Sequence, residues 1–134
     1  MKVKDYIGEW KYYHKNSKQI MIIEHYNNQG NLQGERFVYY NNGVVAQKEF
    51  YEDGKLHGPS ISYSESGVVI KEFLYANGEL HGLSKFYNAE GKLITEGHYK
   101  NDKKHGIWKY YNNGRLVKKK DFTRYSKNPY KKKS

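Results

Sequence analysis

The chain has 134 residues, contains no cysteine and carries a formal net charge of +10. The lack of cysteine excludes disulfides, thiolate metal sites and cysteine nucleophiles. Its longest aliphatic run, residues 20–23, is far shorter than the roughly 20 residues that span a bilayer, and the first residues lack the apolar stretch of a signal peptide. These features predict a cytoplasmic protein without a membrane-spanning helix.

The chain is built from repeats. A glycine recurs every 24 residues, and a tyrosine follows each of these glycines five positions later. The glycines are Gly34, Gly58, Gly82 and Gly106, and the tyrosines are Tyr39, Tyr63, Tyr87 and Tyr111. A fixed period of this length indicates a repeat architecture, in which each unit packs against its neighbours.

In chain order, the repeats predict five units followed by a tail. Residues 6–25 form a degenerate first unit, and residues 26–50 form a unit with one additional residue in its turn. Units 51–74 and 75–98 are regular, and unit 99–122 is one residue short. These units make up a predicted repeat domain over residues 1–122. Residues 123–134 show no repeat signal and are predicted to be a basic, disordered tail.

The regular unit 75–98 indicates the fold. Asn77-Gly78 and residues 88–91 favour tight turns, because Asn and Gly tolerate positive φ angles. Two segments of strand length, around 82–87 and 92–98, follow these turns, and no room remains for a crossover helix. Successive strands must therefore be antiparallel. The sequence predicts an all-β repeat array of β-hairpins that forms one antiparallel meander of about ten strands.

Alternation along the strands assigns the aromatic residues to two faces. We expect one face to carry a row formed by Tyr39, Tyr63, Tyr87 and Tyr111, together with Phe37 and Ile61. We place the tyrosines that open each repeat in the neighbouring row; these are Tyr51, Tyr75 and Tyr99. The residues expected on the opposite face are Trp10, Tyr12, Val38, Phe86, Trp108 and Tyr110. The sequence supplies no second layer, so either the sheet curls on itself or aromatic surface stays exposed.

The segment Tyr51-Glu-Asp-Gly-Lys-Leu-His-Gly58, followed by Tyr63 and Gly67, resembles the MORN repeat and in particular its bacterial variant. The likeness covers about residues 26–122, with a weaker copy from residue 6. It implies hairpins stacked into an elongated, curved sheet that binds a partner and has no catalytic residue. Variant repeats of this type resemble antitoxin or immunity proteins, whereas other MORN proteins are implicated in membrane association or scaffolding.

The histidines and two irregular positions carry further expectations. Equivalent positions in successive units lie about 10 Å apart, too far for one zinc ion whose ligands sit about 2 Å away, so His57, His81 and His105 predict no metal site. Pairs such as His57 with Ser60 are copies of a repeat position, and we expect neither an enzyme nor a cofactor. The glycine after each histidine predicts a bulge or a close strand approach. Gln33 in place of the first histidine and Asp102 in place of a turn glycine predict less regular outer units.

The tyrosine row suggests a binding surface. Tyrosine suits strands but is also enriched at protein interfaces. The choice of 15 tyrosines against five phenylalanines predicts packed rings whose hydroxyls reach water or a partner. We interpret the row as a protein-binding face, and the leading hypothesis is an antitoxin or immunity-type protein that occludes a toxin or effector. Edge strands at both ends permit a homodimer without requiring one.

The C-terminal segment supports an alternative function. Residues 115–134 contain nine Lys or Arg and one Asp, and therefore carry +8 of the net charge. An adaptor could bind an anionic membrane or a nucleic acid through this segment. The other interpretation is a solvated segment that aids solubility and blocks pairing at the last sheet edge. The candidate anion-binding residues are Lys118, Lys119, Lys120, Arg124, Lys131, Lys132 and Lys133.

Overall fold

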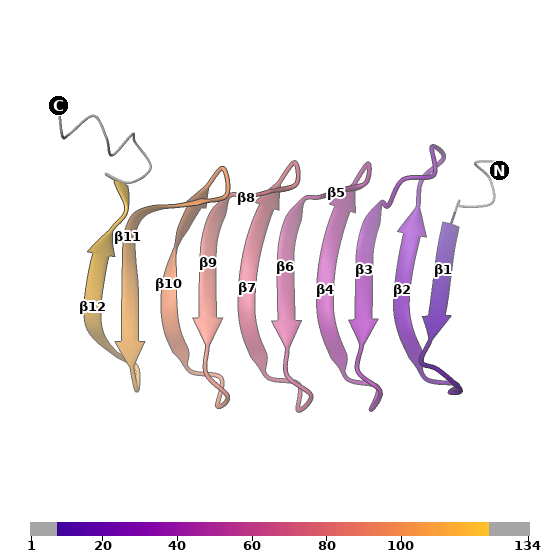
Figure 1. Cartoon of the computed structure of the whole chain (residues 1–134), viewed down its shortest axis with the longest axis horizontal. Coiled ribbons are helices and arrows are strands. Elements are labelled where there is room, and N and C mark those ends of the chain that lie inside the picture. Colours follow the sequence, from indigo (N-terminus) through magenta and orange to yellow (C-terminus); the bar gives the residue numbers. More distant parts are fainter. Residues whose placement is uncertain (1–7, 124–134) are drawn as a thin grey trace.

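The computed structural model describes residues 8–123, which form one open antiparallel β-sheet (Figure 1). The main strands follow one another in the order β1-β2-β3-β4-β6-β7-β9-β10-β11-β12, and the short strands β5 and β8 pair with β4 and β7. Each repeat contributes one hairpin to the sheet. This arrangement confirms the predicted all-β meander of hairpin repeats.

The strand bounds follow the repeat. They are β1 Gly8–Tyr13, β2 Ile20–Tyr26, β3 Gly34–Tyr39, β4 Val45–Glu52, β5 Lys55–Leu56, β6 Gly58–Tyr63, β7 Val69–Ala76, β8 Glu79–Leu80, β9 Gly82–Tyr87, β10 Leu93–Lys100, β11 Lys103–Asn112 and β12 Arg115–Asp121. The segment after Asp121 ends the described part of the chain at residue 123, so the predicted tail and its disorder lie almost entirely outside the described residues.

Backbone hydrogen bonds join successive units at the end of the sheet that carries β5 and β8 (Figure 1). Gly54 N donates to Leu32 O, and Gly78 N donates to Leu56 O, each at 2.8 Å. Each turn is therefore tied to the unit before it, which is how hairpins that are marginal alone become stable in an array.

Asp102 keeps this turn intact, although the last unit differs from the regular ones as expected, with one unbroken strand β11 where they have a short and a main strand. Its φ of 69° is close to the 84° of Gly78, because Asp adopts the left-handed region more readily than most residues. Asp102 N donates to Leu80 O at 3.0 Å, as the glycines do in earlier units. Its carboxylate also accepts a hydrogen bond from Leu80 N at 2.7 Å, a contact that glycine cannot make.

Gln33 also takes over the role of the histidine that it replaces. Gln33 Oε1 accepts a hydrogen bond from Asp53 N at 3.0 Å, and His57 Nδ1 accepts one from Asn77 N at 3.4 Å. Both side chains thus satisfy a backbone N–H in the turn of the following unit. Gln33 thus preserves this hydrogen bond, because an amide oxygen accepts as an imidazole nitrogen does, but its unit is less regular, as expected: Leu32 forms an isolated bridge where later units have β5 and β8.

The glycine after this polar residue lies at a β-bulge, as predicted. Tyr51 pairs with Leu56, whereas Lys48 pairs with Ile61, so the partner strand holds two additional residues around Gly58. The φ of Gly58 is +93°, in the region that favours glycine. Bulges of this kind bend a strand and increase its twist.

Cross-strand partners share a face, so the register defines two faces. We call one the Trp108 face; its central row is Trp10, Glu24, Arg36, Glu49, Ser60, Phe73, Ser84, Gly97, Trp108 and Lys120. As predicted, Tyr12, Val38, Phe86 and Tyr110 lie on this face with Trp10 and Trp108. We call the other the Leu83 face; one of its rows is Phe50, Pro59, Leu74, Leu83, His98 and Ile107.

The tyrosines that open each repeat lie on the Trp108 face, which corrects their predicted placement beside the Tyr63 row. Tyr75 pairs with Gly58, two positions from Ser60. The reason is a register shift between Ser62 and Tyr63. A shift of one residue moves the rest of the returning strand to the other face. Tyr51 and Tyr99 follow the same geometry.

The N-terminal half of the Trp108 face holds a polar cluster. Glu24 and Glu49 are each 7% exposed, and Arg36 lies between them, with Nε 2.9 Å from Glu24 and Nη1 2.9 Å from Glu49. Tyr26 donates to Glu24 at 2.6 Å, and Tyr51 donates to Glu49 at 3.3 Å. These contacts supply the partners that buried carboxylates require.

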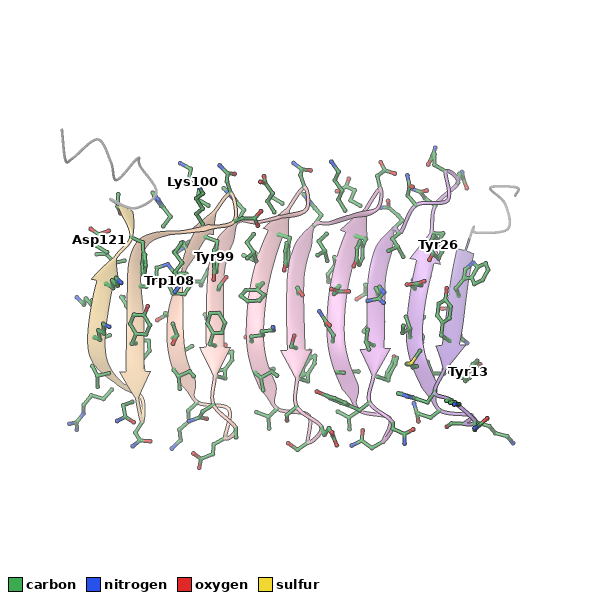
Figure 2. All side chains as sticks on the ribbon, viewed as in Figure 1. Tyr13, Tyr26, Tyr99, Lys100, Trp108 and Asp121 are labelled. Carbon is green, nitrogen blue, oxygen red and sulfur yellow. The ribbon has the colours of Figure 1, made fainter. Side chains whose placement is uncertain are left out.

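The C-terminal half of the Trp108 face is aromatic (Figure 2). Trp108 is 1% exposed; its ring centroid lies 5.1 Å from that of Tyr99 and 6.1 Å from that of Phe122. Its Nε1 donates to His98 O at 3.0 Å, and Lys104 Nζ lies 4.6 Å from its ring centroid. This cluster is the apolar core of the sheet.

Candidate functional site

The Leu83 face brings together the six residues predicted to bind a partner, which are Tyr39, Tyr63, Tyr87, Tyr111, Phe37 and Ile61. All six are half-buried, and Phe37 stacks on Tyr39 with ring centroids 6.2 Å apart. Their shared face follows from the register, whereas their contact with a partner stays a prediction.

Two hydroxyls of the tyrosine row bond within the chain. Tyr87 donates to Glu72 at 2.6 Å, and Tyr111 donates to Glu96. Burial and the hydrogen bond to Glu72 raise the pKa of Tyr87 to about 12, and the hydrogen bond to Glu96 raises the pKa of Tyr111. Both hydroxyls thus donate a hydrogen bond to a carboxylate on the neighbouring strand, and their contact with water or a partner stays a prediction.

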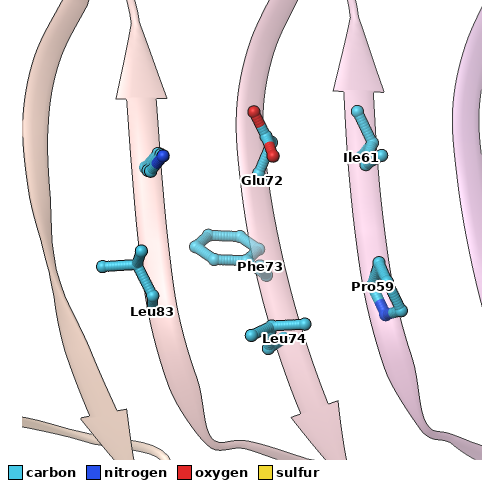
Figure 3. Close-up of a pocket in the computed structure, with 7 residues that line it drawn as sticks. Pro59, Ile61, Glu72, Phe73, Leu74 and Leu83 are labelled. Atoms are coloured by element: carbon cyan, nitrogen blue, oxygen red, sulfur yellow. The ribbon is translucent and has the colours of Figure 1, made fainter.

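The Leu83 face also contains two adjoining hollows, the first mainly apolar (Figure 3) and the second of mixed lining. The first has a volume of about 310 Å³, and its apolar side chains include Pro59, Ile61, Leu74 and Leu83. The second, of about 250 Å³, is lined by residues that include Leu83, His98 and Ile107. Leu83 lines both, so the two hollows adjoin at Leu83 and together extend over the strands from β6 to β11. We call them together the Leu83 groove.

The side chains of the Leu83 groove are accessible. Leu74 is 37% exposed and Ile107 is 54% exposed, in contrast to Trp108 on the other face. Sequence reasoning did not single out Pro59, Leu74, Leu83 or Ile107. The signal was present for Pro59, which stands two positions before Ile61 and therefore shares its face. For Leu74 and Ile107 the bulges obscure the alternation.

Charged residues border the groove in the next row. Glu72 pairs with Lys85, Lys85 with Glu96, and Glu96 with Lys109. The two carboxylates already accept the tyrosine hydroxyls described above. Within residues 8–123, neither Lys85 nor Lys109 belongs to an ion pair. Each ammonium group therefore stands beside the groove without a carboxylate partner.

The charge of the sheet is uneven along its length. Residues 8–98 contain nine Lys or Arg and eleven Asp or Glu, a balance of −2. Residues 99–122 contain eight Lys or Arg and two Asp, a balance of +6. The last unit, which forms one end of the Leu83 groove, is therefore strongly basic, and charge of this density attracts acidic partners.

The predicted anion-binding lysines of β12 are divided between the two faces of the sheet. Lys118 and Lys120 lie on the Trp108 face, with Nζ 5.5 Å from the Tyr110 ring centroid and 5.1 Å from that of Phe122. Lys119, between them, lies on the Leu83 face. The other four candidates lie outside the described residues; these are Arg124, Lys131, Lys132 and Lys133.

The histidine column has a structural explanation at His57, given above. Among residues 8–123, no three His, Asp or Glu side chains gather in a group that could hold a metal ion. Over the same residues, no helix has the length and hydrophobicity needed to cross a bilayer.

The comparisons with known proteins agree with the repeat architecture. The chain matches the family described as MORN repeat variant over residues 32–53, 45–58, 56–77 and 80–101, which together span half of the chain. MORN repeats are non-catalytic modules that bind proteins or membranes. No curated protein matches the chain.

Proposed function

The chain belongs to the MORN repeat variant family, and we propose that it acts as a protein-binding module whose contact surface is the Leu83 face. The observation that carries this proposal is the Leu83 groove. A soluble sheet face normally buries its apolar stripe against a second layer, yet Leu74 and Ile107 stay 37% and 54% exposed. Exposed apolar grooves rimmed by polar residues are typical of interaction sites.

The Trp108 face is a less suitable binding surface, because its central side chains already have partners. Arg36 is hydrogen-bonded to both Glu24 and Glu49, and Trp108 is buried, with Tyr99, Phe122 and Lys104 around it. A partner on that face would have to displace these contacts. On the Leu83 face it would only have to cover the groove.

The more specific form of this proposal is an antitoxin or immunity-type protein that binds a toxin or effector and occludes its surface. The resemblance to variant repeats of that type motivates it. A toxin that naturally engages nucleic acid would carry groups that complement the basic last unit. The alternative is an adaptor that holds an anionic membrane or a nucleic acid through the basic C-terminal segment.

A capture experiment with three variants tests the proposal. The full chain, Leu74→Ser/Ile107→Ser, Val117→Ser and a version ending at Phe122 are each exposed to nuclease-treated native lysate and washed at low and high salt. Val117→Ser is the matched control, because Val117 is 59% exposed on β12 and lines neither hollow of the groove. Circular dichroism confirms that each variant is folded.

We expect one protein to survive the high-salt wash on every version except Leu74→Ser/Ile107→Ser. Capture that is unchanged in that variant would refute the Leu83 face as the contact surface. Capture that requires residues 123–134 and disappears with salt would instead support the adaptor. For the antitoxin form, expression of the captured protein alone should arrest growth, and co-expression of the chain, but not of the groove variant, should restore it.

A further inference from the structure

We propose that the Leu83 groove receives an amphipathic α-helix that lies across strands β6 to β11 and places acidic residues beside Lys85 and Lys109. This inference rests on the proposed protein-binding function and specifies the partner's chemistry. Three features of the groove support it: its spacing, its two hollows and its charge.

The spacing of the groove fits a helix. Five neighbouring strands contribute one floor residue each, namely Pro59, Leu74, Leu83, His98 and Ile107. Neighbouring strands lie about 4.8 Å apart, and one helical turn rises about 5.4 Å. Over the four intervals from β6 to β11 the difference accumulates to only about 2.4 Å. A helix of roughly 13 residues therefore crosses the groove with about one turn over each strand.

An extended peptide fits the same floor poorly. Its side chains on one face repeat every 6.6 to 6.8 Å, so it falls about 2 Å further out of step at each strand. Nor can its backbone pair with the strands beneath it, because β6, β7, β9, β10 and β11 each have a neighbour on both sides. Strand addition is confined to sheet edges.

The two hollows specify where the apolar side chains of the helix lie. The first hollow centres on β7 and the second on β10 (Figure 3 shows the first), two strand intervals or roughly 10 Å apart. Residues i and i+7 of a helix are about 10.5 Å apart along its axis. Two large apolar side chains at i and i+7 would fill the hollows, and a smaller residue between them would pass over Leu83.

The charges at the rim specify the polar flank. Lys85 on β9 and Lys109 on β11 are also two strand intervals apart, and within residues 8–123 neither is ion-paired. Asp or Glu residues seven positions apart on the helix would reach both. Glu96 lies between the two lysines and Glu72 on the other side of Lys85, so both carboxylates disfavour an acidic residue on the helical turns above them. The +6 balance of residues 99–122 directs the more acidic end of the helix toward β11.

A display selection tests the proposal directly, because it needs only random peptides and the folded protein. A library of random 16-residue peptides is selected against the immobilised full chain, with counter-selection against folded Leu74→Ser/Ile107→Ser. The most enriched peptides are synthesised and titrated into isotope-labelled protein. We expect sequences with apolar residues at i and i+7, a flanking Asp or Glu pair at the same spacing, and chemical-shift changes over β6 to β11.

A charge-swapped variant supplies the second readout. Lys85→Glu/Lys109→Glu should weaken the acidic peptides by roughly tenfold, on the scale of two lost surface charge pairs replaced by repulsion, and should strengthen peptides with Lys in place of the acids. Lys55→Glu, on the exposed turn strand β5, is the matched control and should change neither affinity.

Several outcomes would overturn the inference. They are a selection that yields no groove-dependent peptide, enriched sequences with the alternating pattern of a strand or with interior prolines, or equal affinity for acidic and basic peptides. If a lysate protein is nevertheless lost on Leu74→Ser/Ile107→Ser, the proposed protein-binding function stands and only the acidic helix fails.

Discussion

The packing of Trp108 over Gly97 can be tested with a single methyl group. Of the 13 glycines, 12 have a positive φ, and Gly97 is the exception. A side chain at Gly97 would therefore meet no backbone strain. Its Cβ, however, would lie 2.1 Å from Trp108 Cδ2 and 2.3 Å from Cε2, closer than any real contact. Gly97→Ala must push the indole off the sheet.

The size of the effect follows from what the indole loses. Full exposure of a buried tryptophan, about 200 Å², would cost about 5 kcal/mol at 25 cal/mol per Å², and overpacking typically costs about 1–3 kcal/mol. Loss of the Trp108 Nε1 hydrogen bond to His98 O adds about 1 kcal/mol. Because the indole can shift without leaving the cluster, we expect Gly97→Ala to lower the free energy of unfolding by about 2–4 kcal/mol.

Urea unfolding followed by circular dichroism measures this loss, and Gly106 is the control. Gly106 has a φ of +72° and no atom within 4 Å of an added Cβ, so Gly106→Ala should cost only the left-handed backbone penalty of about 1–2 kcal/mol. Asn tolerates that conformation, so Gly106→Asn should be milder than Gly97→Asn. In a Trp10→Phe background, Gly97→Ala should also move the Trp108 emission to longer wavelength. A cost below about 1 kcal/mol with unchanged emission would refute the packing argument.

Three further predictions concern ionisable and unpaired groups. Burial alone would raise the pKa of Glu24, but hydrogen bonds from Tyr26, Arg36 and Tyr12 outweigh it and lower the pKa below its usual 4.5. Ionised Glu24 therefore stabilises the folded state above about pH 4.5, and this contribution is lost as the pH falls through the folded-state pKa. Acid titration of unfolding should show this loss, and Arg36→Met should reduce it. Burial and Glu72 raise the pKa of Tyr87 from 10.0 to about 12, so the folded state keeps a proton that the unfolded state releases, and stability should fall from pH 10 to 12. Tyr87→Phe should lose less stability over this range. In an absorbance titration at the phenolate band, this variant should also have one fewer tyrosine that ionises above pH 10. Ser84 is 1% exposed, and its Oγ has no hydrogen-bond partner among the described residues, so Ser84→Ala should raise the urea midpoint by the equivalent of about 1 kcal/mol.

The topology was predictable because a repeat of 24 residues with two turn signals leaves room only for a hairpin. The face of each residue was predictable until the first bulge. Alternation correctly placed Trp108 and Ile61 on opposite faces. It failed for Tyr75, because the register shift between Ser62 and Tyr63 exchanges the two faces for the rest of the returning strand. Bulges depend on backbone geometry after a turn, and a periodic sequence does not display their position.

The candidate site was only half predictable for a related reason. Repeat columns identify residues that recur, such as Tyr63 and Tyr87, and those proved to lie on the Leu83 face. The groove depends on two columns whose residue type changes from unit to unit, one holding Pro59, Leu83 and Ile107 and the other Leu74 and His98. The same holds for Asp102 and Gln33, where the repeat suggested irregularity. At both positions a different residue type satisfies the same backbone hydrogen-bonding group, and comparing the residue types of successive repeats does not show this.

The central row of the Trp108 face explains why one sheet can leave its other face open. Neighbouring residues in this row are complementary in size or charge: Trp108 covers Gly97, and Arg36 bonds to both Glu24 and Glu49. Each pair is formed across two strands, so the units are linked without a second layer, as repeat arrays require. Stability is therefore supplied mainly on one face. Side chains of the Leu83 groove can therefore vary to suit a partner with little loss of stability. This predicts that Ile107→Ser lowers partner affinity far more than it lowers the urea midpoint, whereas Gly97→Ala lowers the urea midpoint far more than it lowers partner affinity.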